Sequence, residues 1–280
     1  MIDLHSHTDQ SDGTFTPREL VAQAKRVGLG ALAITDHDTF AGYDAALPLA
    51  VEAQLELICG IELSTRFHGA SLHLLGYFPV AAPSRELRVW LNELLATRRD
   101  RNVRLIAKLQ SLGLDITLEE VEKQGRTLTG RPHFARVLVE KGYANDLQHA
   151  FDEYLDESAP GYVDRKEVPV EEAIRRVRES GGIASMAHPV RVAKNNWEKL
   201  GVWVGELAGF GMQAIEVLHS DHAPESRAYY QSLADRYSLA VTGGSDFHGG
   251  NKPNISLGTG IRGNLKVPYD LLERLRVLAA

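Results

Sequence analysis

The chain has 280 residues, 44% of them apolar, and a formal net charge of −6 at pH 7. This length supports one large domain or one domain with an insertion, and the acidic balance argues against broad affinity for long nucleic acid duplexes or anionic membranes. A single cysteine, Cys59, excludes an intrachain disulfide and a cysteine-based zinc site, and the lack of a signal-peptide pattern or of a roughly 20-residue apolar run predicts a cytoplasmic protein.

The first strand-like segment ends in a pair of histidines. Residues 2–4 form an apolar step typical of a short buried strand, and His5 and His7 follow it, with Asp12 five residues further on. Because alternate side chains of a strand point to opposite faces, a bend after His5 is needed to bring both imidazoles to one point. Two surface histidines are the alternative interpretation, and the rest of the chain decides between them.

A helix and a buried strand follow. Residues 16–19 form a capping box with proline at the first helical position, which predicts the start of a helix. The next segment, residues 31–35, is nearly all apolar, as expected for a strand covered on both faces, and it ends in Asp36 and His37. A second helix is predicted over about residues 42–53.

Residues 56–78 predict a strand and then a hairpin. The strand over 56–62 ends at Glu62. Residues 63–78 then alternate like two strands, with a turn at 68–70 between them. We expect this hairpin to return His73 beside Glu62.

The strand pattern is absent from about residue 85 to residue 164. Helices are predicted over 90–112 and near 117–124, 132–141 and 146–157 from apolar residues at three- and four-residue steps. We therefore predict an all-helical insertion domain over 85–164 that has its own small core and covers the active site. The flanking segments, 1–84 and 165–280, would form one further domain.

The alternation of strands and helices then resumes. Strands are predicted over 183–187, 214–218 and 239–242, and a final helix over about 268–278. His188 follows the first of these strands, His219 the second, and Asp246 and His248 the third. About seven strands that alternate with helices predict an α/β fold, a (βα) barrel of irregular or incompletely closed form.

Histidine and carboxylate side chains recur where the predicted strands end. In a parallel barrel these ends share one face, so the side chains would meet at a single mouth. The nine candidate metal ligands are His5, His7, Asp12, His37, Glu62, His73, His188, Asp246 and His248. Imidazole and carboxylate without thiolate suit Zn, Mn or Fe, and an ion with an open position takes three or four protein ligands. Nine ligands therefore predict two or three ions, with Glu62 as a bridge, and metal-assisted hydrolysis of a phosphate ester.

Five short motifs resemble the successive motifs of the PHP (polymerase and histidinol phosphatase) family. They are Asp3-Leu4-His5-Ser6-His7-Thr8, Thr35-Asp36-His37-Asp38, Gly60-Ile61-Glu62, His188-Pro189 and Gly244-Ser245-Asp246-Phe247-His248. The resemblance implies a distorted (βα)7 barrel with a trinuclear metal site, with manganese favoured over iron or zinc. The ligand sets it implies are His5, His7, Glu62 and Asp246; Glu62, His73 and His188; and Asp12, His37 and His248. Many relatives have histidine at the position of Asp12, which affects metal preference.

Motifs of the insertion narrow the resemblance to one bacterial branch. Leu128-Thr129-Gly130-Arg131-Pro132-His133-Phe134-Ala135, with Gly161-Tyr162-Val163 and Ile215-Glu216-Val217, resembles the branch of 3′,5′-nucleotide bisphosphate phosphatases and the 5′-to-3′ exoribonuclease RNase AM. This implies removal of the 3′-phosphate from a nucleoside 3′,5′-bisphosphate such as 3′-phosphoadenosine 5′-phosphate. The alternatives are a 5′-to-3′ exoribonuclease acting on short 5′-phosphorylated RNA and a histidinol-phosphate phosphatase, and the insertion speaks against the latter. A non-catalytic PHP module that stabilises a polymerase is disfavoured because all nine ligands are present.

Several further residues are candidates for substrate contact and proton transfer. The predicted substrate-binding residues are Arg131, His133, Arg191 and His219. Asp246, His222 or metal-bound water would protonate the leaving 3′-oxygen, although a solvated loop is an equal interpretation for His219 and His222. A basic run, Arg98, Arg99, Arg101, Arg104 and Lys108, is expected to be exposed helix charge, with an RNA track as the alternative. The expected partners are a small nucleotide or short RNA, with no obligate protein partner.

Overall fold

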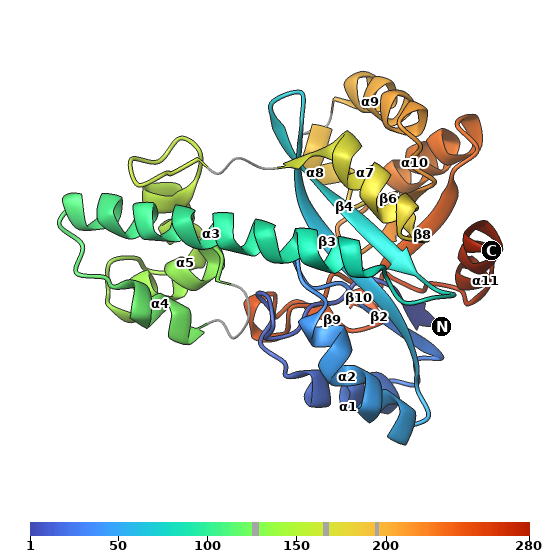
Figure 1. The fold of residues 1–280 in the computed structure, drawn as a ribbon, viewed down its shortest axis with the longest axis horizontal. Coiled ribbons are helices and arrows are strands. Elements are labelled where there is room, and N and C mark those ends of the chain that lie inside the picture. The colour runs from blue at the N-terminus through green and yellow to red at the C-terminus, as the bar shows by residue number, and fades with distance from the viewer. Residues whose placement is uncertain (125–128, 165–167, 194–195) are drawn as a thin grey trace.

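A curved sheet forms the body of the protein. The computed structural model describes residues 1–124, 129–164, 168–193 and 196–280, and its main sheet runs in the order β1-β2-β3-β4-β6-β7-β8, with β5 paired to β3 (Figure 1). The strands are β1 (Ile2–Asp3), β2 (Ala31–Ile34), β3 (Glu56–Phe67), β4 (Ala70–Phe78), β5 (Val168–Pro169), β6 (Ile183–Met186), β7 (Ala214–His219) and β8 (Ala240–Gly244).

The two ends of this sheet approach each other and nearly close it into a barrel. The backbone N–H of Leu4, just after β1, donates to the carbonyl of Gly243 in β8 at 3.2 Å, and the N–H of Asp246 donates to the carbonyl of His5 at 2.8 Å. These bonds hold the ends of the first and last strands side by side. The predicted α/β architecture, a distorted seven-stranded barrel, is confirmed.

The hairpin of β3 and β4 interrupts the parallel order of the sheet. β4 runs antiparallel to both of its neighbours, β3 and β6. His68 and Gly69 form the turn, and both have positive φ, +46° and +77°, as the tight turns that match strand twist require. β3 is one continuous strand from Glu56 to Phe67 rather than two segments divided at residue 62.

Helices cover the outside of the body. They are α1 (Pro17–Arg26), α2 (Ala41–Glu52), α7 (Val170–Glu179), α8 (Val190–Ala193), α9 (Trp197–Gly209), α10 (Pro224–Arg236) and α11 (Asp270–Ala279), with a short β9–β10 pair (Ile255–Ser256, Gly260–Ile261) and a 3₁₀ turn (Gly249–Asn251). The predicted capping box starts α1, where the Thr16 side chain accepts from the N–H of Glu19 and the Glu19 carboxylate accepts from the N–H of Thr16.

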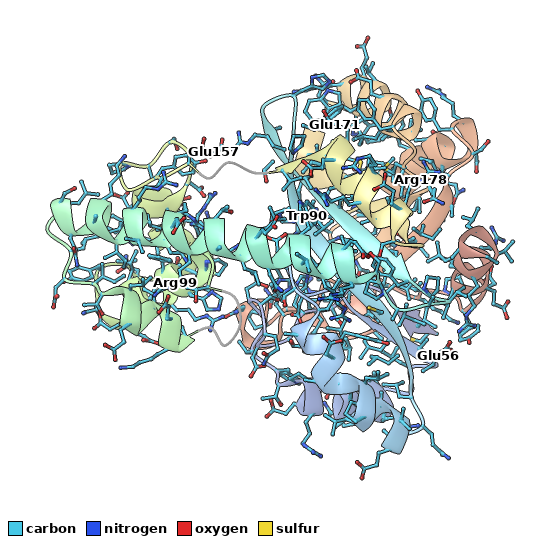
Figure 2. All side chains as sticks on the ribbon, viewed as in Figure 1. Glu56, Trp90, Arg99, Glu157, Glu171 and Arg178 are labelled. Carbon is cyan, nitrogen blue, oxygen red and sulfur yellow. The ribbon has the colours of Figure 1, made fainter. Side chains whose placement is uncertain are left out.

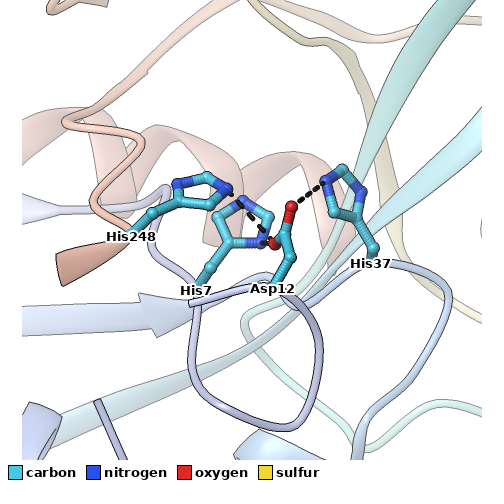
Figure 3. Close-up of side chains that lie close together, drawn as sticks. All are labelled: His7, Asp12, His37 and His248. Carbon is cyan, nitrogen blue, oxygen red and sulfur yellow. Dashed lines mark ion pairs between the residues drawn. The ribbon is translucent and has the colours of Figure 1, made fainter. Parts of the chain in front are cut away.

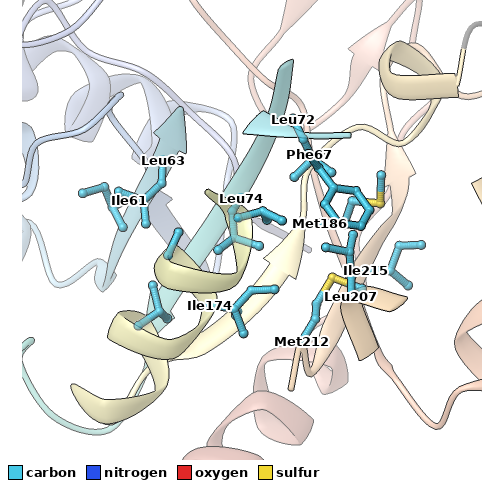
Figure 4. Packing of buried hydrophobic residues seen from close by; sticks show 14 of the residues in the cluster. Ile61, Leu63, Phe67, Leu72, Leu74, Ile174, Met186, Leu207, Met212 and Ile215 are labelled. Atoms are coloured by element: carbon cyan, nitrogen blue, oxygen red, sulfur yellow. The ribbon is translucent and has the colours of Figure 1, made fainter. Parts of the chain in front are cut away.

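The largest hydrophobic core lies between the β3–β4 hairpin and the helices that cover it. Figure 4 shows part of this core, which contains Ile61, Leu63, Phe67, Leu72, Leu74, Ile174, Met186, Leu207, Met212 and Ile215. Full burial of one such side chain contributes about 1.5–3 kcal/mol. The core therefore fixes the hairpin against β6, β7, α7 and α9, and with it the strand that carries Glu62.

A lobe of helices projects from the body along one long helix. The lobe contains α3 (Arg85–Ser111), α4 (Leu118–Gln124), α5 (Arg131–Glu140), α6 (Leu147–Ala150) and a π-helix (Phe151–Leu155). The first turns of α3 pack into the core of the body through Leu87 and Trp90, whereas Leu105 and Leu109 join a separate core within the lobe. Figure 2 shows this change of surroundings along α3, from Trp90 over the strands to Arg99 at the lobe.

The predicted domain limits stay a prediction. Because the first turns of α3 pack on the body, the packing changes within α3 and not at residue 85. Residues 165–167, where the second segment of the barrel is expected to start, lie outside the described residues, as does Leu128 of the insertion motif. Over the described residues, no helix has the length and apolar character that crossing a membrane requires.

Candidate metal centre

The nine predicted ligands lie close together, most of them just after strands and two of them, Glu62 and His73, within the β3–β4 hairpin. His5 and His7 follow β1, His37 follows β2, and Glu62 lies within β3, where a bridge pairs it with His37. Four partly overlapping groups of histidine and carboxylate side chains result, and within each group the potential ligand atoms all lie within 4.8 Å of one another. Three of these groups contain only predicted ligands.

The first group consists of His5, His7, Glu62 and Asp246, all buried. The Oε2 atom of Glu62 lies 3.3 Å from Nε2 of His5 and 3.1 Å from Nε2 of His7. The Oδ1 atom of Asp246 lies 3.5 Å from each of the same two nitrogens. Two imidazoles and two carboxylates thus converge on one point, which is the ligand set that the motifs imply for one ion.

The second group consists of Asp12, His37, His248 and His7 (Figure 3). The Oδ1 atom of Asp12 lies 3.2 Å from Nε2 of His248, and its Oδ2 atom lies 3.7 Å from Nε2 of His37. His7 joins this group because its Nδ1 atom lies 3.5 Å from Oδ1 of Asp12. This adds one residue to the expected set of three.

Two further imidazoles, of His73 and His188, lie near the other oxygen of Glu62, and His73 forms a third group with Glu62 and His37. The Oε1 atom of Glu62 lies 2.9 Å from Nδ1 of His73 and 2.9 Å from Nε2 of His188. The register of the hairpin pairs Ser64 with His73, two residues along β3 from Glu62. Glu62 therefore contacts imidazoles through both oxygens, as a bridging carboxylate would.

The chemistry of these atoms fits divalent metal ions. Among the described residues, Nε2 of His5, Nε2 of His7 and Nδ1 of His37 are buried and make no hydrogen bond, although carboxylate oxygens lie near them. A buried polar atom without a partner costs about 1–3 kcal/mol. A cation among these lone pairs would satisfy them all, and a donor set of imidazole and carboxylate suits Zn, Mn or Fe.

Electrostatics keeps two of the predicted ligands, Glu62 and His37, in the protonation states that metal binding needs. Burial opposes ionisation of Glu62, but nearby His37, His73 and His5 hold its pKa well below the usual range. Burial also lowers the pKa of His37 to about 4. Near neutral pH the carboxylate is therefore charged and the imidazole neutral, with its lone pair available to a metal.

Glu216 contacts two of the predicted ligands, and this role was not predicted from the sequence. Its Oε1 atom lies 2.9 Å from Nδ1 of His5, and its Oε2 atom accepts the backbone N–H of His188 at 2.7 Å. The carboxylate is fully buried within β7. A single glutamate inside an otherwise apolar strand was the available signal, because such a residue is almost never buried unless it is paired.

Two of the predicted ligands have an unusual backbone conformation. His188 and Asp246 have positive φ, +25° and +58°, in a region that residues other than glycine adopt at some cost and that is frequent at functional sites. Before Asp246, a Cβ atom on Gly244 would lie 2.3 Å from the backbone nitrogen of His5. Only glycine allows β1 and β8 to approach this closely.

The metal-ligand groups open into a cleft of about 510 Å³ between the body and the lobe. From the lobe, its lining includes Arg98, Arg101 and Arg131. Arg98 and Arg101 are 9% and 4% exposed, so these two members of the basic run are not the exposed helix charge that was expected. Arg98 forms an ion pair with Asp38 of the body.

The structure brings only some of the predicted substrate residues to this cleft. Arg131 and Arg191 line it, whereas His133 and His219 are absent from the described lining. The Nδ1 atom of His133 accepts the N–H of Gly130 at 3.0 Å and so caps the start of α5. His219 is buried behind Asp246, with its Nε2 atom 3.5 Å from Oδ2 of that residue.

The two candidate proton donors are placed differently. His222 is buried against Val217, whose carbonyl lies 2.9 Å from its Nδ1 atom, and it does not reach the described lining of the cleft. Asp246 does line the cleft. Its Oδ2 atom lies 2.6 Å from Nζ of Lys252 and 2.8 Å from a guanidinium nitrogen of Arg191. Burial opposes its ionisation, but these cations hold its pKa well below the usual range, so Asp246 has no proton to donate near neutral pH.

Comparisons with known proteins agree with this geometry. The model of the PHP domain family matches residues 3–164. The 5′-3′ exoribonuclease Rnm of Escherichia coli is 37% identical over 88% of this chain and 84% of its own length. The 3′,5′-nucleoside bisphosphate phosphatase of Chromobacterium violaceum is 31% identical over 88% of this chain and 87% of its own.

A solved structure matches the whole chain. It is a protein of Bifidobacterium adolescentis, assigned as a metal-dependent phosphoesterase, which covers 99% of this chain and is itself covered to 95%, with a TM-score of 0.86 and 31% identity. The family match spans more than half of the chain, and the ligand groups complete it with residues from the remaining part. The chain therefore belongs to the PHP domain family and is a metal-dependent phosphoesterase.

Proposed function

We propose that this protein is a phosphomonoesterase that removes the 3′-phosphate from nucleoside 3′,5′-bisphosphates, such as 3′-phosphoadenosine 5′-phosphate. The products would be the nucleoside 5′-monophosphate and phosphate. A relative at 31% identity is named for this activity. The proposal includes a small nucleotide as the partner and a cytoplasmic location.

The observation that carries the proposal is the distribution of charge in the cleft. Predicted metal ligands of the body, such as Glu62 and Asp246, line the cleft on one side, while Arg101 and Arg131 line it from the lobe. Arg131 lies over the ring of Tyr162, 5.1 Å from its centroid, which leaves its donors to an anion. A substrate with two phosphates would engage both regions at once.

The residues that would hold divalent ions are the nine predicted ligands, grouped as His5, His7, Glu62 and Asp246; Glu62, His73 and His188; and Asp12, His37 and His248. We propose two or three ions, with manganese favoured over iron or zinc. When bound, such ions supply an activated water and neutralise charge on the phosphoryl group. Glu216 and Lys252 orient His5 and Asp246 around them.

Arg191 and Lys252 have a positioning role beside the phosphoryl group. Both contact Oδ2 of Asp246, so the Oδ1 atom of that carboxylate is left facing His5 and His7. Arg191 also contacts Asp221 at 2.5 Å, which fixes the plane of its guanidinium. Planar donors held in this way suit the oxygens of a phosphate.

Asp246 and His222 divide into different roles under this proposal. Asp246 is ionised and serves as a ligand, whereas His222 packs against the ring of His219, with 5.0 Å between the ring centroids, and does not contact the substrate. His219 in turn reaches Oδ2 of Asp246. The proton for the leaving 3′-oxygen would then come from solvent in the cleft.

A 5′-to-3′ exoribonuclease is the second candidate, because a second cavity adjoins the cleft. A cavity of about 260 Å³ is lined by Arg98, Arg99 and Asn102, and Arg98 also lines the main cleft. A second cavity beside the first, with two arginines and one glutamate (Glu122) in its lining, would extend the site toward a further nucleotide of a short RNA. The 37% identical relative is named as an exoribonuclease.

The test is release of phosphate by the manganese-loaded protein from five substrates with product analysis. These are 3′,5′-bisphosphoadenosine, 3′-AMP, 5′-AMP, a 5′-phosphorylated RNA oligomer and histidinol phosphate. Fast conversion of the bisphosphate to 5′-AMP, with slow release from either monophosphate, is expected. Mononucleotides that appear stepwise from RNA at a comparable rate would favour the exoribonuclease, and turnover of histidinol phosphate alone would overturn both candidates.

A further inference from the structure

Part of the cleft lining that the lobe supplies is apolar. Phe151, Leu147 and Pro132 line the same cleft as Glu62 and Asp246, yet none of the three carries a group that binds phosphate or metal. They come from three neighbouring elements of the lobe, the π-helix, α6 and the first turn of α5. Apolar side chains beside a charged site call for a ligand that has an apolar face as well as phosphates.

The fold holds Phe151 firmly at this position. Ala150, directly before it, and Leu155, four residues after it, are fully buried in the core of the lobe. Between them the helix widens into a π-helix, and the N–H of Asp156 donates to the carbonyl of Phe151 at 2.9 Å. Phe151 itself is only partly buried, because part of its ring packs against the lobe while it also lines the cleft.

We propose that Phe151, flanked by Leu147 and Pro132, is a stacking platform for the nucleobase of the substrate. The inference rests on the proposed function and names how the base is bound. Every nucleobase has a flat π face that stacks on an aromatic side chain. Pro132 follows Arg131 directly, so the platform adjoins the cation proposed to meet the second phosphate.

The platform binds bases without distinguishing them. Gln148, three residues before Phe151, also lines the cleft, and one of its amide N–H groups donates to Oδ1 of Asp152 at 2.8 Å, which leaves its amide oxygen and second N–H as the groups that could contact a base. Stacking tolerates any base, whereas base selection needs directed hydrogen bonds. We therefore expect adenosine, guanosine, cytidine and uridine 3′,5′-bisphosphates to be turned over with kcat/KM values within about tenfold of one another.

The test compares a nucleotide with a substrate that lacks the base. Phe151→Ala should raise KM for 3′,5′-bisphosphoadenosine about tenfold and leave KM for 1-O-methylribose 3,5-bisphosphate unchanged. Phe151→Trp, which keeps a flat π face, should retain nucleotide KM. Phe151→Leu, which keeps apolar volume without that face, should raise the KM for the nucleotide as Phe151→Ala does. Phe210→Ala removes an aromatic ring from the end of α9, where Phe210 is 45% exposed, and serves as the control.

The outcomes separate the platform from the proposed function. An equal rise in KM for both substrates, no change for either, or a Leu variant that matches the Trp variant would overturn the platform. If the wild-type protein releases phosphate from neither bisphosphate, the proposed function fails, and calorimetry with 5′-AMP and ribose 5-phosphate then tests the platform by itself. Tighter binding of 5′-AMP that Phe151→Ala abolishes would support it, and equal binding of the two would refute it. Thermal unfolding of each variant reports whether the lobe stays folded.

Discussion

Glu216 acts on two predicted metal ligands without lining the cleft. One oxygen contacts the imidazole of His5, and the other accepts the backbone N–H of His188. A carboxylate behind a ligating histidine fixes its tautomer and raises its basicity. His5 and His188 belong to different ligand sets, so one buried side chain orients ligands in both.

Replacement of this carboxylate should weaken metal binding more than it changes the fold. Glu216→Gln keeps the shape of the side chain but loses the charge behind His5, and we expect manganese affinity to fall about 10–100-fold. Calorimetric titration of the metal-free protein measures this effect. Glu225→Gln, on the exposed start of α10, is the matched control. Equal affinity of the two variants would show that Glu216 only fills space.

At the scale of elements, α3 joins the lobe to the mouth of the barrel. Arg98 lies in the middle of this helix and pairs with Asp38, just after the ligand His37, and it also donates to Oγ of Ser64 at 3.1 Å. Asp38 in turn accepts the N–H of Ser64 at 2.8 Å. The ion pair is largely buried, so the position of the lobe is coupled to the strand end that carries His37.

Loss of one partner of this ion pair should lower the stability of the fold. Arg98→Met leaves the Asp38 carboxylate buried without its cation, and we expect the free energy of unfolding to fall by about 3–5 kcal/mol. The double variant with Asp38→Asn should recover most of this stability, because asparagine carries no charge that needs a cation. Asparagine also tolerates the positive φ of +52° at that position. Urea denaturation measures both. Arg99→Met, which breaks an exposed pair with Glu122, should cost less than about 1 kcal/mol, and an equal loss at both positions would contradict this account.

Local patterns predicted the elements, but not the contacts between distant ones. Hydrophobic alternation and capping residues sufficed for the hairpin and for α1, since their determinants are neighbours in the chain. The burial of Arg101 depends on how α3 meets the body, and the pattern of a helix cannot reveal that. His133 belongs to a motif that predicted substrate contact, yet α5 starts at Arg131 with Pro132 in its first turn, so His133 is the third helical residue and accepts the N–H of Gly130. Glu216 could be recognised only once its strand was placed beside His5.

At the scale of the whole molecule, the metal centre joins segments from both ends of the chain. His7 and Glu62 come from the segment before the lobe, and Asp246 comes from the segment after it. β1 and β8 meet through only a few backbone hydrogen bonds. Ions bound among these side chains would therefore close the barrel as well as provide chemistry.

Metal removal should accordingly lower the stability of the whole fold. An ion present at about a hundredfold excess over its Kd adds about 2.7 kcal/mol to the folded state, which corresponds to roughly 5–10 °C in Tm. We expect manganese to raise the Tm of chelator-treated protein by this amount, as measured by calorimetry. His7→Asn, which removes a member of two ligand groups, should abolish most of the rise, whereas His68→Asn at the exposed hairpin turn should keep it. If both variants respond to manganese like the unaltered protein, the ions bind elsewhere and the two segments are held together by packing alone.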